Sequence, residues 1–397
     1  MKLYRNYRYR LYPTKEQKDL LDLHFFLSNQ AWNSTLAMKM ADLKENSSLP
    51  LAEKVYIKDK DIEKAMNNDL KARGFKPHSG IVQESFKVMK NSLAEFYKKR
   101  KSNPSTTIGF PKFKSSNEIE QSFHFKNQGV SWTNSYFKIL KNKIKWDFHR
   151  ELPQNHKLVG LVVKRTSDGK YHIILNISFD DDTIYEKTGV ECAIDLNIGN
   201  IAVTDSKGKS KLIKLENFNK NKYSKTYRKL QQQLSKRYKE RNFSKNTKKL
   251  QQKSNKMYTK IKNKKEDFYH KLSNELTNEF DRITFEKLEI KKMKESKSTR
   301  LNRLISDISW NSLIEKTKYK SEMKNKIIRE INPAYSSQRC SKCGFIHKNN
   351  RKSQSDFVCL ECNFTENADI NASRNLFDYD KWSPEQTTMI KHWNRPD

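Results

Sequence analysis

Four cysteines near the carboxyl end of the chain constrain its fold more than any other feature. They form two CxxC pairs, Cys340-Cys343 and Cys359-Cys362, with 15 residues between the pairs. This spacing lets two short turns supply four thiolates in a tetrahedron around one Zn²⁺ ion. Four protein ligands leave no open coordination position, so we expect a structural zinc rather than a catalytic one. The fifth cysteine, Cys192, lies in an apolar run and is interpreted as a core residue.

The charge balance indicates a polyanionic partner. The 397 residues include 80 Lys and Arg against 46 Asp and Glu, a formal net charge of +34. Such a chain repels itself unless a polyanion neutralises it, and nucleic acid gains affinity by releasing condensed counterions. A solvated basic surface with no dedicated partner is the alternative, but the excess runs through most of the chain. The length predicts two to four domains.

The sequence predicts a cytoplasmic protein. Residues 1–10 are charged and strand-like, which is unlike a signal peptide, and no apolar run is long enough to span a membrane. Two close cysteine pairs do not resemble a secreted disulfide framework. We therefore expect no membrane partner.

The first half of the chain alternates between strand and helix patterns. Residues 2–12 alternate as a strand, and Thr14 to Gln17 read as a capping box that opens a helix. A second helix is expected over 57–72 and a third from about Ser79, where apolar residues recur at steps of three and four. This region is predicted to be a helical block inserted after the first strand.

From about residue 106 the pattern becomes β. Three segments of alternating aromatic and basic residues are followed by two strands that flank the turn sequence 166–169, which predicts a hairpin. The three segments are GFPKFK (109–114), SFHF (122–125) and YFKILKNKIKWDF (136–148). We expect these strands to close with residues 2–12 into a small barrel, whose basic and aromatic face suits backbone and stacking contacts with nucleic acid.

The second half carries a different unit. Residues 192–196, 201–205 and 282–286 read as strands, and 220–280 read as a Lys-rich helical hairpin between them. An amphipathic helix is expected over 300–328. After the cysteine-bearing insert, a short helix is predicted from about residue 369.

Three acids stand at equivalent points of these elements. Asp195 and Glu286 each end a strand, and Asp369 opens the last helix. If these points converge, their oxygens can hold two Mg²⁺ ions about 3.5–4 Å apart, which suits phosphodiester hydrolysis. Two of the acids also have an ordinary interpretation, Asp195 as a turn former and Asp369 as a helix N-cap. The order of the elements is nevertheless that of a ribonuclease-H-like core.

Several segments resemble the TnpB family, the transposon-encoded relatives of type V CRISPR effectors, in the same order along nearly the whole chain. They are YRYRLYPTKEQ (7–17), GFPKFKS (109–115), AIDLNIGN (193–200), FEKL (285–288), NRLISDISWNSLIEKTKY (302–319), SSQRCSKCG (336–344) and ADINASRNL (368–376). The last motifs are specific in combination because they surround the four-cysteine insert. Two departures are visible: Asn197 and Arg339 stand where the family often has Gly and a smaller residue.

The resemblance implies an RNA-guided DNA endonuclease. Its implied partners are a guide RNA from the transposon end and double-stranded target DNA beside a short motif. It assigns Asp195, Glu286 and Asp369 as the catalytic, Mg²⁺-binding triad. The zinc ligands it assigns are Cys340, Cys343, Cys359 and Cys362. Three residues of the helical block are further candidates for nucleic-acid contact, with ordinary exposed positions as the alternative: Lys76, Gln83 and Tyr97.

The expected fold class is α+β and multidomain: a barrel with a helical recognition block, and a RuvC-like ribonuclease-H fold with a zinc ribbon. The predicted domains are the barrel (1–13 and 106–188), the helical block (14–105), the nuclease (189–335 and 366–384), the zinc ribbon (336–365) and a tail (385–397). A monomer is favoured. The alternatives are a nuclease-inactive RNA-guided repressor, a compact type V CRISPR effector and, less well matched, a DNA-transposing recombinase.

Overall fold

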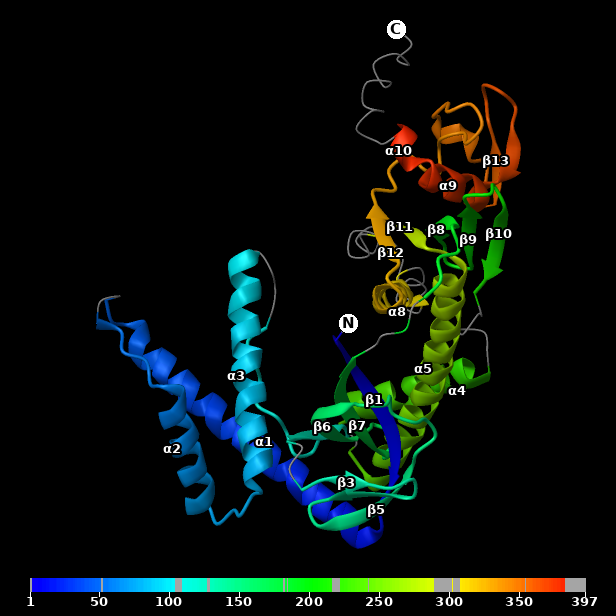
Figure 1. Cartoon of the computed structure of the whole chain (residues 1–397). Helices are drawn as coiled ribbons and strands as arrows, with labels where there is room; N and C mark the ends of the chain where they lie inside the picture. Colours follow the sequence, from blue (N-terminus) through cyan, green and yellow to red (C-terminus); the bar gives the residue numbers. More distant parts are fainter. Residues whose placement is uncertain are drawn as a thin grey trace. The chain divides into compact units, whose positions relative to one another are not determined.

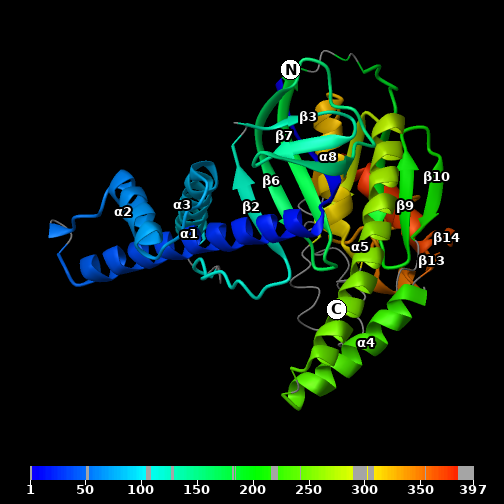
Figure 2. The same ribbon diagram turned by 90° about the horizontal axis from the view of Figure 1, so that it is seen from below.

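The computed structural model describes residues 2–50, 53–103, 109–126, 129–180, 183, 185–215, 222–241, 243–288, 302, 308–353 and 355–382. The chain divides into two compact units, Met1–Asp182 and Thr183–Asp397 (Figures 1 and 2). The predicted boundary between 188 and 189 lies close to this division. The predicted boundaries at 105/106 and 384/385 lie outside the described residues. Within the described ranges, no helix combines the length and apolar character needed to cross a bilayer.

A seven-stranded antiparallel sheet forms the centre of the first unit, in the order β2-β6-β7-β1-β5-β4-β3. The strands are β1 (Lys2–Tyr12), β2 (Gln121–Phe125), β3 (Ser131–Trp132), β4 (Tyr136–Ile139), β5 (Asn142–Asp147), β6 (Lys157–Arg165) and β7 (Tyr171–Asp180). β1 pairs with β7 along almost its whole length, as its alternating pattern predicts. Tyr7, Tyr9 and Leu11 are buried on one face while Arg8 and Tyr12 are exposed on the other.

Three features of this sheet differ from expectation. The described strands β2 and β3 end the sheet without pairing with each other, so it is an open half-barrel rather than a closed barrel. The segment 109–114 forms no strand. The segment 136–148 is not one strand, because Leu140 and Lys141 both take positive φ and make a two-residue turn between β4 and β5. Neither residue type signals such a turn, so the sequence pattern concealed it.

Three helices complete the first unit: α1 (Lys15–Ser47), α2 (Asp59–Ala72) and α3 (Ser79–Ser102). The predicted capping box is confirmed, since Thr14 accepts from the Gln17 N–H and the Gln17 side chain accepts from the Thr14 N–H. The helices pack through a shared cluster of Ala31, Met66, Val82 and neighbouring apolar residues. The helical block is thus confirmed as a set of three packed helices.

A five-stranded mixed sheet organises the second unit, in the order β10-β9-β8-β11-β12. The strands are β8 (Glu191–Leu196), β9 (Asn200–Asp205), β10 (Ser210–Lys214), β11 (Arg282–Glu286) and β12 (Ile327–Ile331). β8, β9 and β10 form an antiparallel meander, and β11 runs parallel to both β8 and β12. β12 was not predicted. The helix expected over 300–328 ends at Met323, and Asn325 with positive φ turns the chain into the strand.

The remaining elements are α4 (Lys222–Lys239), α5 (Lys245–Glu279), α8 (Trp310–Met323), η2 (Lys348–Asn350), β13 (Asp356–Val358), β14 (Thr365–Asn367), α9 (Ala368–Phe377) and α10 (Tyr379–Trp382). Tyr269 and Leu276 of α5 and Trp310 of α8 form the main core of this unit with Cys192 and Ile194 of β8. The core assignment of Cys192 is therefore confirmed. α9 packs on β8 and β9 (Figure 1).

Candidate metal centres

Strand alternation places two of the candidate acids on the sheet face that carries α9. In β8, Cys192, Ile194 and Leu196 join the core beneath α5 and α8, so the residues between them point to the opposite face. Ala193 accordingly packs with Leu376 of α9, and Asp195 shares its side. β11 alternates in the same way, and its pairing sets Phe285 opposite Ile194, which brings Glu286 next to Asp195.

α9 supplies the third acid from its first turn. Asn367 is the N-cap: its Oδ1 accepts from the N–H groups of Asp369 (3.0 Å) and Ile370 (3.2 Å). The interpretation of Asp369 as the cap is therefore wrong. Because Asn367 satisfies the exposed N–H groups, the Asp369 carboxylate remains available to the sheet. Asp369 is 3% exposed, compared with 7% for Asp195 and 8% for Glu286.

Each of these carboxylates has a dedicated hydrogen-bond donor. The Leu196 N–H donates to Glu286 Oε1 (2.9 Å), and the Asn197 amide donates to Asp195 Oδ2. Asn200 Nδ2 donates to Asp369 Oδ2 (3.0 Å). These contacts fix the three acids on one face.

A cation from the cysteine-bearing segment reaches the same site. Arg351 Nη2 lies 3.1 Å from Asp369 Oδ1. This Arg351–Asp369 contact is the single ion pair among the described residues that includes a carboxylate of the triad. The sequence offered no signal for Arg351, because its role depends on how the zinc segment folds against α9.

The electrostatics show an excess of buried negative charge. Burial, and then the charge of Asp369, raise the pKa of Asp195 to about 7, although the Asn197 hydrogen bond and Arg351 act in the opposite direction. Burial and the charge of Asp195 raise the pKa of Glu286 to about 8, against the Leu196 N–H. With all three acids ionised, Arg351 leaves two negative charges uncompensated. That uncompensated charge favours the binding of divalent cations.

The donor chemistry fits magnesium. The site offers carboxylate oxygens, which hard divalent cations prefer, and it contains no thiolate. Asn200 Oδ1 is in addition a buried oxygen without a hydrogen-bond partner in the described part of the chain. Asp195, Glu286 and Asp369 would hold the cation.

The four cysteines form a closed ligand set. Their Sγ atoms all lie within 4.8 Å of one another, and no other such group of His, Cys, Asp or Glu occurs among the described residues; the triad acids are spread more widely. The pairs Cys340–Cys362 and Cys343–Cys359 are separated by 3.8 and 3.5 Å. A tetrahedron with Zn–S bonds of about 2.3 Å requires S–S distances of about 3.8 Å. The residues therefore fit structural zinc.

Two equivalent turns position these thiols. The Cys340 N–H donates to Phe345 O and the Cys359 N–H donates to Phe364 O, both at 2.9 Å. Each turn ends in a residue with positive φ, Gly344 in the first and Asn363 in the second. His347, the histidine between the two turns, accepts from the Asn349 N–H and is not in the cluster.

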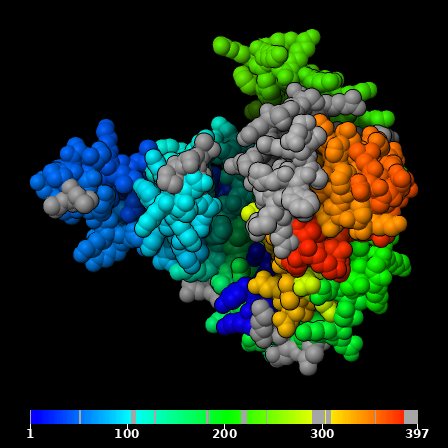
Figure 3. Space-filling view, turned by 90° about the horizontal axis from the view of Figure 1, so that it is seen from above, coloured from blue at the N-terminus to red at the C-terminus, as the bar shows by residue number. Residues whose placement is uncertain are grey.

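Buried asparagines attach the zinc segment to the helix of Asp369. Asn350, with no exposed surface, donates to Gln338 O and Phe345 O and accepts from the Leu360 N–H, so it joins the two turns. Asn371 and Asn375 of α9 donate to Arg339 O at 2.8 and 2.7 Å. Figure 3 shows the orange surface of this segment continuing into the red surface of α9 and α10. The sequence pattern predicted none of these three asparagines as functional.

The two departures from the family pattern both have local roles. Asn197 is the hydrogen-bond donor to Asp195. Arg339 Nη1 donates to Asn375 Oδ1 (2.8 Å), and its guanidinium lies over the Trp382 ring, 5.1 Å from the centroid. The larger side chains are therefore used in positioning the acids and the zinc segment.

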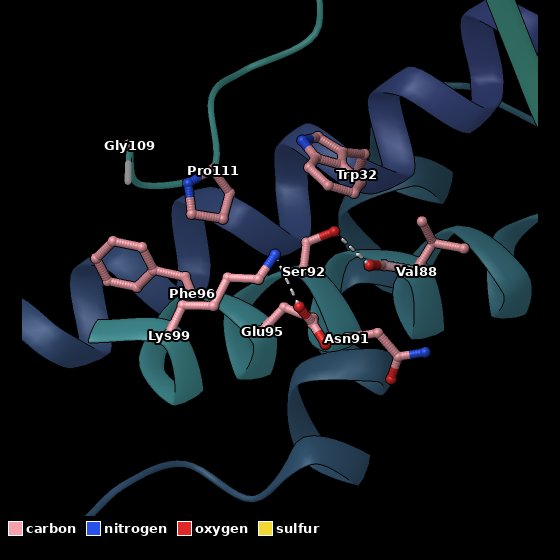
Figure 4. Close-up of a pocket in the computed structure, with 9 residues that line it drawn as sticks. All are labelled: Trp32, Val88, Asn91, Ser92, Glu95, Phe96, Lys99, Gly109 and Pro111. Carbon is pink, nitrogen blue, oxygen red and sulfur yellow. Dashed lines mark hydrogen bonds and ion pairs between the residues drawn. The ribbon is translucent and has the colours of Figure 1, made fainter. Parts of the chain in front are cut away.

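The three nucleic-acid candidates of the helical block do not form one site. Gln83 and Tyr97 lie on the exposed side of α3, and Gln83 Oε1 accepts from Lys126 Nζ (3.0 Å). Lys76 lines a separate groove together with residues of α2. A hollow of about 510 Å³ between α1, α3 and residues 109–111, shown in Figure 4, is lined by Trp32 and Phe96 but by none of the three. Their role stays a prediction.

Three family models match the chain. A model described as "Probable transposase" (OrfB of IS605) matches residues 175–297, and the associated "Helix-turn-helix domain" matches 1–48. A model described as "Cas12f1-like, TNB domain" matches 310–376, which includes the four cysteines and Asp369. In the structure, the described part of this stretch forms the strand β1 and one long helix, α1, rather than two short helices.

Whole-chain relatives agree with these models. The putative RNA-guided DNA endonuclease InsQ of Escherichia coli K12 is 29% identical over 308 residues, which cover 74% of this chain and 73% of that protein. A putative RNA-guided DNA endonuclease of Streptomyces pristinaespiralis is 23% identical over 386 residues, covering 94% and 88%.

Among solved structures, Cas12f1 in complex with single-guide RNA and target DNA superposes with a TM-score of 0.61 at 18% identity, covering 91% of this chain and 83% of that one. The fold thus defines the class: a mixed α/β protein of the compact Cas12f type, with a half-barrel sheet and a four-cysteine cluster. Within that class, the matched models and several named relatives are those of the TnpB family, the OrfB proteins of IS605-type elements, to which the chain is similar along most of its length.

Proposed function

We propose that this protein is an RNA-guided DNA endonuclease that hydrolyses target DNA at Asp195, Glu286 and Asp369. The observation that carries the proposal is the convergence of these acids, from β8, β11 and α9, on one face of the second sheet. Two relatives that span most of the chain are named putative RNA-guided DNA endonucleases, and the Cas12f1 structure of the same fold contains guide RNA and target DNA.

A ribonuclease-H-like, RuvC-type nuclease unit is the interpretation we propose for the second sheet. An antiparallel meander followed by two parallel strands, with acids at the ends of the first and fourth strands in chain order, supports it. When bound there, a pair of Mg²⁺ ions would supply an activated water and stabilise the leaving oxygen of a phosphodiester. The protein groups hold the three acids in place, and the four-cysteine zinc would fix α9 through Asn371 and Asn375.

The basic surfaces of the chain support RNA and DNA as partners. Between residues 222 and 265, which include α4 and most of α5, the sequence has 17 lysines and arginines and one acid, Glu240. On the first sheet, Arg10 lies opposite His172. Burial, followed by the charges of Arg8 and Arg10, lowers the pKa of His172 to about 3. Such concentrated positive charge is stabilised by phosphates.

The proposal is tested with the full chain and the RNA that co-purifies with it. Sequencing that RNA defines the guide, and a duplex carrying the matching target is then incubated with Mg²⁺. We expect cleavage by the wild type, loss of cleavage without loss of RNA in Asp195→Ala, and no change in Asp267→Ala, an exposed acid of α5. Undiminished cleavage by Asp195→Ala would remove this acid from the site. Absence of a co-purifying RNA would contradict the guided mechanism.

A further inference from the structure

A fourth oxygen-bearing side chain, Asn200, lies beside the three acids. Asn200 is the first residue of β9, and Ala202 two residues later pairs with Asp195 of β8. Alternate residues of β9 face α9, because Thr204 is hydrogen bonded to Ser373 of that helix at 2.6 Å. Asn200 therefore shares the face on which the acids converge.

The contact with Asp369 fixes the orientation of the Asn200 amide. Its Nδ2 donates to Asp369 Oδ2 at 3.0 Å. The reversed orientation would set an amide oxygen against a carboxylate oxygen, which repel each other, so the identity of the two amide atoms is determined. Asn200 Oδ1 is consequently the end that does not contact Asp369.

This oxygen is buried and has no hydrogen-bond partner in the described part of the chain. A buried acceptor without a partner costs free energy, so its retention needs a cause. Asn197, the other amide that donates to a triad acid, is partly buried like Asn200, but its oxygen is not among the buried atoms that lack a partner in the described part of the chain.

We propose that Asn200 supplies a fourth oxygen ligand to the divalent cation of the triad, while its amide nitrogen holds Asp369 in place. The inference rests on the proposed function, because it assumes that the acids bind a cation. Carbonyl oxygens of Asn side chains are ordinary ligands of hard divalent cations. A neutral ligand completes the coordination without adding a fourth negative charge to acids that already repel one another.

The test uses Mn²⁺ as the probe and the full chain freed of RNA at high salt. The chain is grown with asparagine carrying ¹³C at the side-chain carbonyl, and Mn²⁺ binding is followed by titration and by electron–nuclear double resonance. We expect a ¹³C coupling from a directly bound amide, present in the wild type and in Asn197→Ala and absent in Asn200→Ala. Asn200→Ala should also weaken Mn²⁺ binding about tenfold. Asp369→Ala is included to identify the binding site, because Mn²⁺ binding that is lost in this variant takes place at the triad.

The outcomes separate the two proposals. Two results would show that Asn200 is not a ligand while the triad remains a cation site. In the first, Mn²⁺ binding depends on Asp369 but the wild type shows no ¹³C coupling. In the second, Asn200→Ala keeps both the coupling and the affinity for Mn²⁺. If no Mn²⁺ binding depends on Asp369, the proposed nuclease site itself fails. Should Asn200→Ala unfold, Asn200→Leu, which fills the same space without an oxygen, takes its place.

Discussion

Asn350 is predicted to control how tightly the four cysteines retain zinc. Its side chain is fully buried, and its three hydrogen bonds, at 3.0 to 3.3 Å, join the turn of Cys340 to the turn of Cys359. In Asn350→Ala, the Leu360 N–H and the Gln338 carbonyl each lose a partner inside the segment. The two cysteine pairs then have no direct link through this side chain.

The size of the effect follows from these three bonds. A net hydrogen bond contributes about 0.5–1.5 kcal/mol, and a buried group left without its partner costs about 1–3 kcal/mol. Phe345 O keeps a second donor, the Cys340 N–H, and Gln338 O keeps the His347 N–H at 3.4 Å, so the Leu360 N–H is the one of these three backbone groups left without a partner. Together with the loss of the other two bonds, we therefore expect a loss of about 2–4 kcal/mol in the free energy that orders the segment. If it appears wholly in zinc binding, retention falls about 30- to 1000-fold.

A chelator competition with a chromogenic zinc indicator measures this directly, and thermal unfolding of the zinc-loaded chain gives a second reading. Asn349→Ala is the matched control, because Asn349 is adjacent and its side chain is exposed. We expect zinc to be withdrawn from Asn350→Ala at chelator concentrations that leave the wild type and the control loaded. Equal retention in all three proteins would refute the claim that Asn350 joins the two turns.

Three further predictions concern charge. Arg351→Ala removes the cation that competes with metal for Asp369, so a titration should show Mn²⁺ binding about fivefold more tightly. This factor is the equivalent of ~1 kcal/mol, the size expected for a partly exposed ion pair. Unchanged or weaker Mn²⁺ binding would contradict this prediction. Burial alone would raise the pKa of Asp281, but backbone N–H groups and Lys326 outweigh it and lower the pKa. The ionised form of Asp281 therefore stabilises the fold at pH values above its pKa in the unfolded chain. This stabilisation is lost as the pH falls through the pKa of Asp281 in the folded protein, below about pH 4. Urea unfolding should then depend less steeply on acid pH in Asp281→Asn than in the wild type, and identical profiles would exclude the effect. Reversing Lys248 and Lys249 on α5 to Glu should reduce the salt slope of RNA binding by about two if both contact phosphates, whereas an unchanged slope would place RNA elsewhere.

Alternation and ligand spacing carried most of what the sequence could predict. Period-two alternation located β1, short apolar runs located β8 and β11, and the paired CxxC turns located the zinc segment. These signals are local and depend on residue type. The two-residue turn at Leu140 and Lys141 has no such signal, because neither residue favours positive φ; one strand was therefore predicted where the structure has two.

The residues that fix the site escaped prediction for a different reason. Asn350, Asn371 and Asn375 are buried polar residues whose partners are mainly backbone carbonyls and N–H groups. An asparagine in a sequence ordinarily indicates a turn or a surface. Nothing in the pattern distinguishes it from one whose hydrogen bonds join two segments. Arg351 is equally silent, since its contact with Asp369 exists only once the zinc segment is folded on α9.

The helix α9 shows why Asp369 could be predicted from the sequence, whereas the contacts that position it could not. Residues 369 and 373 contact β9, through Asn200 and Thr204. Residues 371 and 375 bind the zinc segment instead, and Ala368, Ala372 and Leu376 are buried. All three sets repeat at a spacing of four, so one ten-residue helix contacts the sheet and the zinc segment at once. A shift of one residue would turn every set about 100° away from its partner. The direction of the Asp369 carboxylate is therefore set by the zinc segment as much as by the sheet. This dependence follows from how the sets of α9 residues are spaced relative to one another, and no single sequence motif contains that information.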